Sequence, residues 1–359
     1  MLLVTDLERG GTPLRLARLA RGLRAAGVDV YMGCLAPPGP VAEELESAGI
    51  PTFACHAEDA RDVLALARLS QIARRLRPDL IHATLLHANV AARLIGVVQR
   101  IPVIASTATI EQERPWHRAL ERATAGIERA HLVNSHTLAD HVVRVFGVPC
   151  RRVHIVPASL DPWPVRIDRA AARAALAIPE HEFVVAWVGR LDPVKRLELV
   201  IGCAEILASA ASRFLLIGDG PDRPRVEHLL RRSSARDRLH LLGWRSDVPA
   251  ILSAADAFLF PSLTEGMPNA VLEAMACGVP VLASDIPVHR ELAGDEQRVL
   301  LVSGDDARDF AAALLRLRDE PGRRATLADR AATWARAHLD PHATVQAVMR
   351  IYREVLAAR

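Results

Sequence analysis

The sequence predicts an α/β fold with two domains, each built on a parallel sheet, and three observations support this class. The chain has 359 residues, which is long for a single hydrophobic core. Short apolar runs alternate with longer amphipathic stretches, and strand, helix, strand at this spacing is typical of parallel sheets covered on both faces. The alternation lapses near residues 158–171, which hold two prolines and an Asp-Pro step. We therefore expect two Rossmann-like domains, 1–160 and 161–339, whose sheets face a central cleft.

The candidate strands are short apolar runs, and the stretches between them have the spacing of amphipathic helices. In the first half the candidate strands are 2–5, 28–34, 79–83, 102–107, 131–135 and 153–157, and the clearest helices are 14–27 and 61–76. In the second half the candidate strands are 183–189, 213–219, 238–243, 257–262, 280–285 and 298–303. Ligands of open parallel sheets bind beyond the carboxyl ends of the strands, so the loops after these runs are the candidate sites.

Composition excludes several classes of function. The formal net charge is only +3 and no dense basic tract occurs, so we do not expect a nucleic-acid partner. The five cysteines are scattered without a CxxC pair, which is typical of reduced core cysteines in a cytoplasmic protein. The sequence has no run of 18 apolar residues, and its N-terminus lacks the pattern of a signal peptide. Nothing in the composition indicates an oligomeric state.

The lysine content points to one loop. Of the 45 Lys and Arg residues, 44 are Arg, a bias typical of a GC-rich bacterial genome, and the exception is Lys195. It lies with Arg190 in VGRLDPVKRLELV (188–200), between a strand that ends at Val188 and a helix that starts near Val194. Two cations beyond a strand end could neutralise a diphosphate, and a compact ammonium differs from a planar guanidinium. A solvated basic loop is the alternative interpretation.

Three further loops carry weaker signals. Gly10 and Gly11 lie between the first strand and the first helix, where they could let the backbone approach an anion or could simply form a tight turn. The segment GDGPDR places Arg223 where a dinucleotide fingerprint has its third glycine, and no acid follows at the expected distance, so we exclude a nicotinamide site. Trp244 follows another strand end and could border a nucleobase or cover the sheet edge.

The segment LTEGMPNAVLEAMACGVP (263–280) contains two glutamates. A turn-rich loop, Ser262–Pro268, precedes a predicted helix from Asn269 to Cys277, which Gly278 would end. This helix is apolar nearly all round, so we expect Glu273 to be a buried carboxylate. Its partner would then come from elsewhere in the fold or from a ligand such as a ribose. A carboxylate can accept hydrogen bonds from both hydroxyls of a ribose.

Glu265 and Glu273 could in principle form the acid and base of a glycosidase. One lies in a loop and the other in a predicted buried helix, which does not suit such a pair. The backbone N–H groups of residues 266–269 would also direct the positive end of the helix toward the loop. A sugar diphosphate needs that field and a neutral glycosidic bond does not, so we disfavour a hydrolase.

These segments together resemble the retaining glycosyltransferases of family 4 (GT4), which have the GT-B fold. The motifs GRLDPVKR, GDGPDR, LGWRSDV, PSLTEGMPNAVLEAMACGVPVLASD and the N-terminal Gly-Gly loop keep the family's order from near residue 1 to about 335. The E-x7-E segment is specific, whereas the Gly-Gly and GDGP pieces are weak singly. The resemblance implies two Rossmann-like domains and a C-terminal helix that crosses back onto the first. Residues 342–359, or about 340–359 with its cap, could be that helix.

The resemblance implies that the C-terminal domain binds a nucleotide sugar, UDP- or GDP-linked, and that the N-terminal domain binds the acceptor. Arg190 and Lys195 would hold the diphosphate, Glu273 the ribose and Glu265 the donor sugar, with Arg190, Lys195 and Glu265 as the catalytic group. The remaining donor contacts would be Gly10, Gly11, Trp244, Val248, Gly266, Met267, Pro268 and Asn269. Transfer would proceed with retention by front-face attack, in which the leaving phosphate helps to deprotonate the acceptor. No cofactor and no metal are implied, and no D-x-D segment suited to a metal-bound diphosphate occurs.

The sequence departs from the family in two places that concern the acceptor side. Residues 158–161 read ASLD where the family often has Asn-Gly-Val-Asp, and residues 107–110 lack the His or Arg that many members carry near the donor sugar. His82 and His87 follow a strand end, and either could serve the acceptor or be a core or capping residue. Residues 111–130, with Trp116 among arginines, could rest on an anionic membrane that carries a lipid-linked acceptor, or form an ordinary surface helix.

We therefore expect a metal-independent hexosyltransferase of glycan, glycolipid or natural-product biosynthesis, located in the cytoplasm or at the inner face of the membrane. One alternative is a nucleotide-sugar epimerase on the same architecture, which would need extra acids and histidines in the cleft. The other is a non-catalytic sugar-nucleotide binding module, which we disfavour because Arg190, Lys195, Glu265 and Glu273 are all present.

Overall fold

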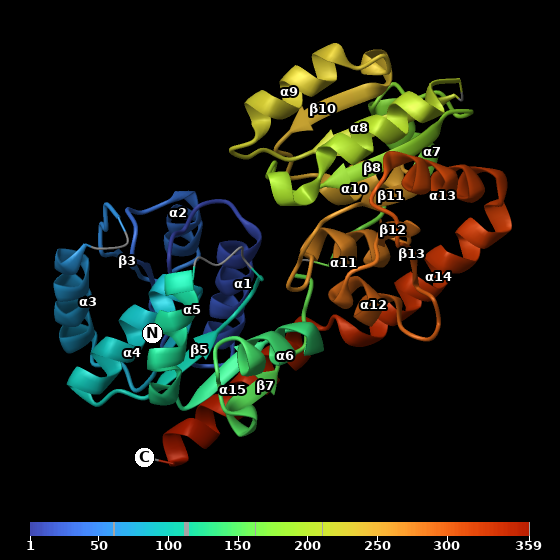
Figure 1. Ribbon diagram of the computed structural model, residues 1–359. Helices are drawn as coiled ribbons and strands as arrows, with labels where there is room; N and C mark the ends of the chain where they lie inside the picture. Colours follow the sequence, from blue (N-terminus) through green and yellow to red (C-terminus); the bar gives the residue numbers. More distant parts are fainter. Residues whose placement is uncertain (60–61, 111–114, 162, 210, 359) are drawn as a thin grey trace. The chain divides into compact units, whose positions relative to one another are not determined.

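The computed structural model describes residues 1–59, 62–110, 115–161, 163–209 and 211–358. These residues form two compact units, each a parallel sheet covered by helices (Figure 1). The first unit comprises Met1–Ser159 and Asp340–Arg359, and the second comprises Leu160–Leu339. The fold class expected from the alternation of strands and helices is therefore confirmed.

The first unit contains a seven-stranded parallel sheet in the order β3-β2-β1-β4-β5-β6-β7. The central strands are buried along their whole length, which explains their unbroken apolar runs. The strands are β1 (Leu2–Val4), β2 (Met32–Cys34), β3 (Thr52–Ala54), β4 (Ile81–Thr84), β5 (Val103–Ser106), β6 (Ala130–Val133) and β7 (Val153–Ile155). The helices are α1 (Gly11–Ala25), α2 (Pro40–Ser47), α3 (Val63–Leu76), α4 (Leu86–Gln99), α5 (Pro115–Thr124), α6 (His136–Arg144) and α15 (Pro341–Ala357), with 3₁₀ turns η1 (Ala125–Ile127) and η2 (Cys150–Arg152).

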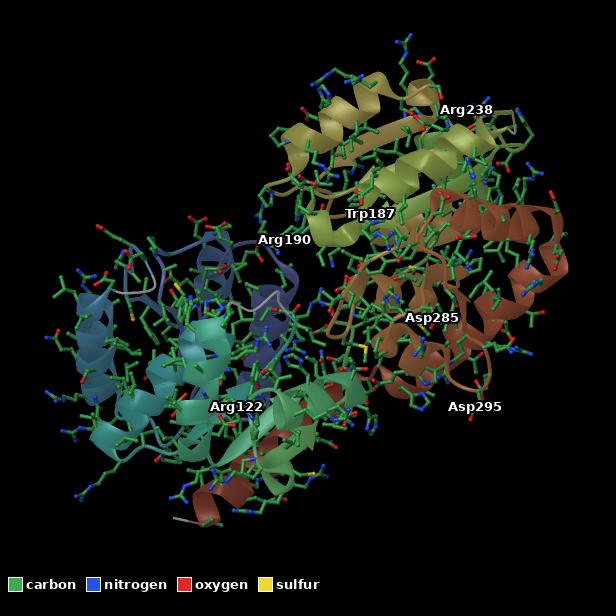
Figure 2. The ribbon with its side chains drawn as sticks, in the orientation of Figure 1. Arg122, Trp187, Arg190, Arg238, Asp285 and Asp295 are labelled. Atoms are coloured by element: carbon green, nitrogen blue, oxygen red, sulfur yellow. The ribbon has the colours of Figure 1, made fainter. Side chains whose placement is uncertain are left out.

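The second unit contains a six-stranded parallel sheet in the order β10-β9-β8-β11-β12-β13. The strands are β8 (Phe183–Val188), β9 (Ser212–Ile217), β10 (Leu239–Gly243), β11 (Ala257–Phe260), β12 (Val281–Ser284) and β13 (Val299–Val302). The helices are α7 (Arg169–Ala175), α8 (Leu197–Ile206), α9 (Arg223–Arg232), α10 (Val248–Ser253), α11 (Asn269–Ala276), α12 (Pro287–Ala293), α13 (Ala307–Asp319) and α14 (Pro321–His338), with 3₁₀ turns η3 (Pro193–Lys195), η4 (Leu207–Ser209) and η5 (Arg236–Arg238). Trp187, in β8, is fully buried in this unit (Figure 2).

Strand β3 is the described strand that the sequence pattern does not predict. It has only three residues, all half-buried, and it pairs with β2 at the edge of the sheet. A short edge strand leaves neither a long apolar run nor a clear alternation, so its signal is lost between the flanking turns. The helix predicted at 61–76 begins at Val63, and residue 61 lies outside the described residues.

Helix α15 belongs to the first unit, although it follows the second unit in the sequence (Figure 1). Val348 and Ile351 are buried in the same core cluster as Ala20 of α1. The two helices meet closely because residue 22 is glycine: a Cβ there would lie 2.4 Å from a methyl group of Val345. This packing makes α15 part of the hydrophobic core that supports the first sheet.

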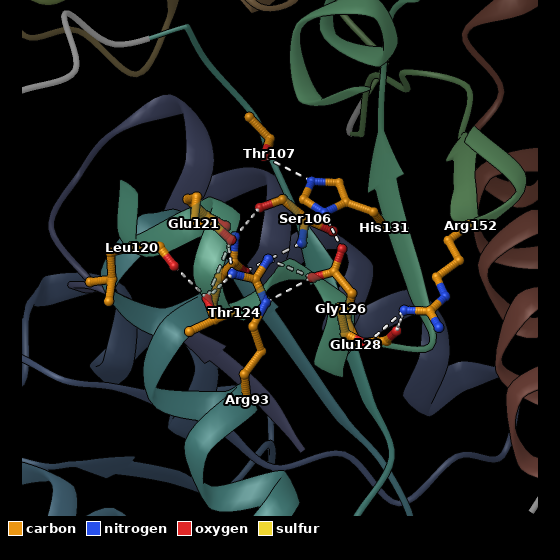
Figure 3. A network of polar contacts seen from close by, with 11 residues as sticks. Arg93, Ser106, Thr107, Leu120, Glu121, Thr124, Gly126, Glu128, His131 and Arg152 are labelled. Carbon is orange, nitrogen blue, oxygen red and sulfur yellow. Dashed lines mark hydrogen bonds and ion pairs between the residues drawn. The ribbon is translucent and has the colours of Figure 1, made fainter. Parts of the chain in front are cut away.

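A buried ionic network joins α4, α5 and β6 of the first unit (Figure 3). The Arg93 guanidinium is fully buried, forms an ion pair with Glu121, and donates from Nε to Glu128 at 2.8 Å. His131 contacts Glu128 through Nδ1 at 2.7 Å and Thr107 Oγ1 through Nε2 at 2.9 Å. Burial raises the pKa of Glu128, but His131 and Arg93 outweigh it and hold that pKa below its usual range. The network thus ties the loop after β5 to the start of β6.

Candidate active site

The cationic loop of the second unit follows β8. Arg190 is exposed there and forms an ion pair with Asp192 at 2.9 Å (Figure 2). Asp192 also caps the turn η3, because its side chain accepts a hydrogen bond from the Val194 N–H at 3.1 Å. The helix predicted to start near Val194 begins with this 3₁₀ turn, and the α-helix α8 starts at Leu197. The Arg190 side chain is therefore open to solvent, while the hydrogen bond between Asp192 and the Val194 N–H fixes the backbone of the loop.

Lys195 is held in a different way from Arg190. Its ammonium forms an ion pair with Glu265, which lies 70 residues further along the chain. It also lies 5.2 Å from the centre of the Phe260 ring, a distance at which the face of the ring attracts a cation. The two charged side chains are only 17% and 9% exposed. Because β8 and β11 are neighbours in the sheet, the pair joins two adjacent strand ends.

The loop before α11 and the helix itself have the predicted arrangement, with one correction. Pro268 is the residue before the helix, α11 runs from Asn269 to Ala276, and Gly278 has a positive φ of 63° just beyond its end. Glu273 is half-buried, although we expected it to be fully buried, whereas its neighbours Leu272 and Ala274 in the helix are buried. The buried carboxylate of this segment is Glu265, which is 8% exposed and already paired with Lys195.

The other expected donor contacts of the second unit also lie at strand ends or helix starts. Trp244 follows β10 and is 50% exposed, and Val248 is the half-buried first residue of α10. Gly266 is buried and Met267 half-buried in the loop that contains Glu265. The carboxyl edge of the sheet therefore carries these residues together with the Lys195–Glu265 pair.

The paired glycines of the first unit lie beyond β1. Gly10 is the residue before α1, and Gly11 is the first residue of that helix. Gly10 has φ −152° and ψ 167°, an extended conformation that any residue adopts. A Cβ at Gly10 would touch only Pro13 Cδ, at an ordinary 3.7 Å. Neither backbone strain nor packing in this unit demands a glycine here. The glycine would instead be explained by a ligand that approaches the backbone closely.

The two candidate acceptor histidines differ in their surroundings. His82 is 2% exposed, and its ring nitrogens contact Tyr352 Oη and Ser106 Oγ, both at 2.6 Å. Burial lowers the pKa of His82 to about 3, so the ring is neutral. Of the interpretations that the sequence left open for His82, this placement favours a core residue over an acceptor contact. His87 is half-buried near the start of α4, and its Nε2 atom has no hydrogen-bond partner among the described residues.

His289 is a residue of this region that the sequence analysis missed. Its ring is fully buried and donates from Nδ1 to the Ser284 carbonyl at 2.8 Å. The same ring lies 5.8 Å from the ring of Phe260, whose face contacts the Lys195 ammonium. Burial lowers its pKa, while the charges of Glu265 and Lys195 act on it with opposite signs. The segment SDIPVHREL does not by itself indicate a site residue, because only the fold brings His289 next to Phe260.

Neither a metal-binding cluster nor a membrane-spanning helix is found among the described residues. No group of three or more His, Cys, Asp or Glu side chains is arranged there to hold a metal ion. Among the helices of the described part, none has the length and apolar character needed to cross a membrane.

Comparison with known proteins identifies the family of both halves. Residues 182–320 match the family described as glycosyl transferases group 1, and residues 9–163 match glycosyltransferase family 4. The chain is 26% identical over 302 residues to an Escherichia coli UDP-Gal:α-D-GlcNAc-diphosphoundecaprenol α-1,3-galactosyltransferase, covering 79% of this chain and 78% of that protein. It is 27% identical to the 2-deoxystreptamine N-acetyl-D-glucosaminyltransferase of Streptomyces fradiae, covering 83% of this chain and 80% of that one.

Among solved structures, the fold is similar to that of Anabaena HepE in complex with UDP. The TM-score is 0.85 at 21% identity, and the match covers 98% of this chain and 99% of HepE. Both domain matches, the curated relatives and the fold agree. The chain belongs to the family 4 glycosyltransferases and is an enzyme of that class with the GT-B fold.

Proposed function

We propose that the enzyme transfers a sugar from a UDP- or GDP-linked donor to a hydroxyl of its acceptor, with retention of configuration and without a metal ion. The observation that carries this proposal is the Lys195–Glu265 pair, which places a compact cation and a carboxylate at the carboxyl ends of β8 and β11. Structures of HepE hold UDP and UDP-glucose, which supports a nucleotide-sugar donor for a chain of the same fold.

In the proposed complex the diphosphate lies at the cationic loop. Arg190 is exposed and can turn from Asp192 to a phosphate, whereas Lys195 needs only to exchange Glu265 for a phosphate oxygen. The freed Glu265 carboxylate would then accept hydrogen bonds from the donor sugar. Glu273, which is half-buried, would accept from the ribose hydroxyls, and Trp244 and Val248 would border the base.

The proposed chemistry follows from these charges. The bond between the anomeric carbon and the phosphate oxygen breaks while the acceptor oxygen bonds to the same face of that carbon. The acceptor proton passes to an oxygen of the leaving phosphate. Arg190 and Lys195 stabilise the negative charge that develops on the diphosphate, which is the role that a metal ion has in other transferases. No side chain forms a covalent intermediate.

The acceptor side of the proposal concerns the first unit and its helix α5. Arg122 on this helix is exposed (Figure 2), which would favour contact with an anionic membrane that carries a lipid-linked acceptor. Residues 111–114 of the predicted amphipathic stretch lie outside the described residues. Such an enzyme would act in glycan, glycolipid or natural-product biosynthesis at the cytoplasmic face. Sedimentation with vesicles of phosphatidylglycerol, compared with phosphatidylcholine, tests the membrane contact, and equal sedimentation would contradict it.

The donor assignment is tested by ligand-observed NMR with a panel of UDP- and GDP-sugars. We expect one of them to bind the wild type at micromolar to millimolar concentration, and Glu273→Ala to weaken binding about tenfold through lost ribose contacts. If no nucleotide sugar binds the wild type, the proposal fails, and if Glu273→Ala binds equally well, the ribose assignment fails. The anomeric proton coupling of the product then tests retention, and activity in EDTA tests metal independence.

A further inference from the structure

Three shielded polar atoms of the first unit have no hydrogen-bond partner among the described residues. They are Thr5 Oγ1, His87 Nε2 and Asn134 Oδ1. A polar group buried without a partner costs about 1–3 kcal/mol, so three in one unit call for an explanation. A ligand that supplies the missing hydrogen bonds would remove that cost.

The three residues share one place in the topology. Thr5 directly follows β1, His87 lies three residues beyond the end of β4, and Asn134 directly follows β6. In the sheet, β1, β4, β5 and β6 are successive neighbours. The unsatisfied atoms are therefore all at the carboxyl edge of the central strands, which is where ligands of open parallel sheets bind. Strands lie about 4.8 Å apart, so about 10 Å separates the ends of β4 and β6.

Backbone strain marks the same edge. Leu85, between β4 and α4, has φ 76° and ψ 154°, a region that residues other than glycine rarely enter. Hydrogen bonds hold it there, from its N–H to the Ser106 carbonyl at 3.2 Å and from the Asn89 N–H to its own carbonyl at 2.8 Å. Such strain costs about 1–3 kcal/mol and is concentrated at ligand sites. Here it fixes where α4 begins and hence where His87 lies.

An aromatic surface borders His87. The ring of His87 lies 5.6 Å from that of His117 and 6.3 Å from that of Trp116, and the last two are 3.9 Å apart. Trp116 is 46% exposed, so much of its indole is open to a ligand. A large flat side chain of this kind suits a ring with one apolar C–H face.

The unsatisfied groups are neutral. Burial lowers the pKa of His87, which keeps its imidazole uncharged near pH 7, and the other two are a hydroxyl and an amide. Hydroxyls of a ligand can donate to Nε2 and Oδ1 and can accept from a threonine. None of the three groups carries a positive charge that could pair with a phosphate or carboxylate. The three atoms therefore match a polyol better than an anion.

We propose that this edge of the first unit is the acceptor site, and that it takes an uncharged polyhydroxylated ring, a sugar or a cyclitol. The ring stacks on Trp116 while its hydroxyls bond to His87 Nε2 and Asn134 Oδ1, with Thr5 at the far end of the site. The inference rests on the proposed transferase function, because it names the acceptor of that reaction. In a lipid-linked acceptor the same site would hold the sugar headgroup.

The test is saturation-transfer NMR on the full chain with myo-inositol, methyl α-D-glucoside and methyl α-D-mannoside, against inositol 1-phosphate and glucose 6-phosphate as matched anions. The variants are Trp116→Ala and Asn134→Ala, with Trp163→Ala in the second unit as the control for loss of an exposed tryptophan. We expect a neutral ring to bind the wild type and the control, and binding to weaken at least tenfold in both test variants. UDP binding and the thermal unfolding midpoint should change little in Trp116→Ala, since that side chain is exposed.

The outcomes separate this inference from the proposed function. If no nucleotide sugar binds the wild type, the transferase proposal itself fails. If the donor binds but neutral rings do not, if the phosphorylated rings bind more tightly, or if Trp116→Ala binds the neutral ring as the wild type does, the acceptor inference alone is overturned. The binding result for Asn134→Ala is used only if the unfolding midpoint of that variant stays near that of the wild type. If the midpoint falls, Trp116→Ala alone tests the inference.

Discussion

The buried network around Arg93 makes a quantitative prediction about stability. The side chains of Arg93, Glu121 and Glu128 are at most 1% exposed. Arg93→Met removes the guanidinium and leaves the carboxylates of Glu121 and Glu128 buried without their shared cation. Breaking a buried pair in this way costs about 3–5 kcal/mol. For a unit of this size, about 1 kcal/mol lowers the unfolding midpoint by about 2–4 °C, so we expect a fall of about 10 °C.

Differential scanning calorimetry is the assay, because it can resolve the transitions of the two units separately. The expected fall should appear in the transition of the first unit. The control is the triple variant Arg93→Met, Glu121→Gln, Glu128→Gln, which removes the charges together and should recover part of the loss. A single variant within about 1 kcal/mol of the wild type at pH 7 would refute the reasoning.

The pH dependence gives a second check on the same network. In the wild type the pKa of Glu128 is held low, so its contribution is present above the unfolded pKa of about 4.3 and is lost as the pH falls through the folded value. Arg93→Met removes one of the two partners that lower the pKa of Glu128, so that pKa rises toward the value that burial favours, and each unit of rise costs about 1.4 kcal/mol at neutral pH. That penalty fades as the pH falls through the raised pKa of Glu128 in the variant. A stability gap between wild type and variant that widens as the pH falls from neutral would contradict the assignment.

Three shorter predictions concern the sites. Gly10→Ala should leave the unfolding midpoint within about 0.5 kcal/mol of the wild type, because a Cβ there meets only Pro13 Cδ at 3.7 Å, yet should raise the donor KM; an unchanged KM would show that the ligand stays clear of this backbone. Lys195→Arg keeps the charge but not the compact ammonium paired with Glu265, so UDP affinity measured by calorimetric titration should fall about tenfold, and equal affinity would count against the assignment. His289→Phe removes the Nδ1 donor to the Ser284 carbonyl, which keeps only its bond from the Ile286 N–H, and should cost about 0.5–1.5 kcal/mol in urea unfolding, whereas His289→Asn retains a donor and should cost less; equal losses would disprove the role of Nδ1.

The sequence predicts the elements whose signal is local. Strands such as β8 are long buried runs, and Pro268 and Gly278 bracket α11 as turn chemistry requires. The three residues of β3 carry no such signal. The choice of lysine at position 195 also points to the site without any structure, since every other basic position in the chain uses arginine.

What the sequence does not show is which distant side chains meet. Glu273 and Arg93 both lie in apolar helical runs, and the argument applied to Glu273 applies equally to Arg93. The structure exposes part of Glu273 and buries Arg93 completely, because burial depends on which face each helix turns to its neighbours. The pairing of Lys195 with Glu265 spans 70 residues and likewise follows only from the strand order. The donor contacts predicted from the family motifs stay predictions until a ligand is bound.

The position of α15 has a consequence for how the protein is made. Its buried residues complete the core of the first unit, but they are synthesised only after the whole of Leu160–Leu339. At about 5–20 residues per second, the first sheet waits roughly ten to forty seconds on the ribosome with the α1 surface around Gly22 uncovered. The continuous second unit can fold during that interval. A released chain truncated before residue 341 should therefore carry a folded second unit beside an incomplete first one, and should depend on chaperones more than the full-length protein does.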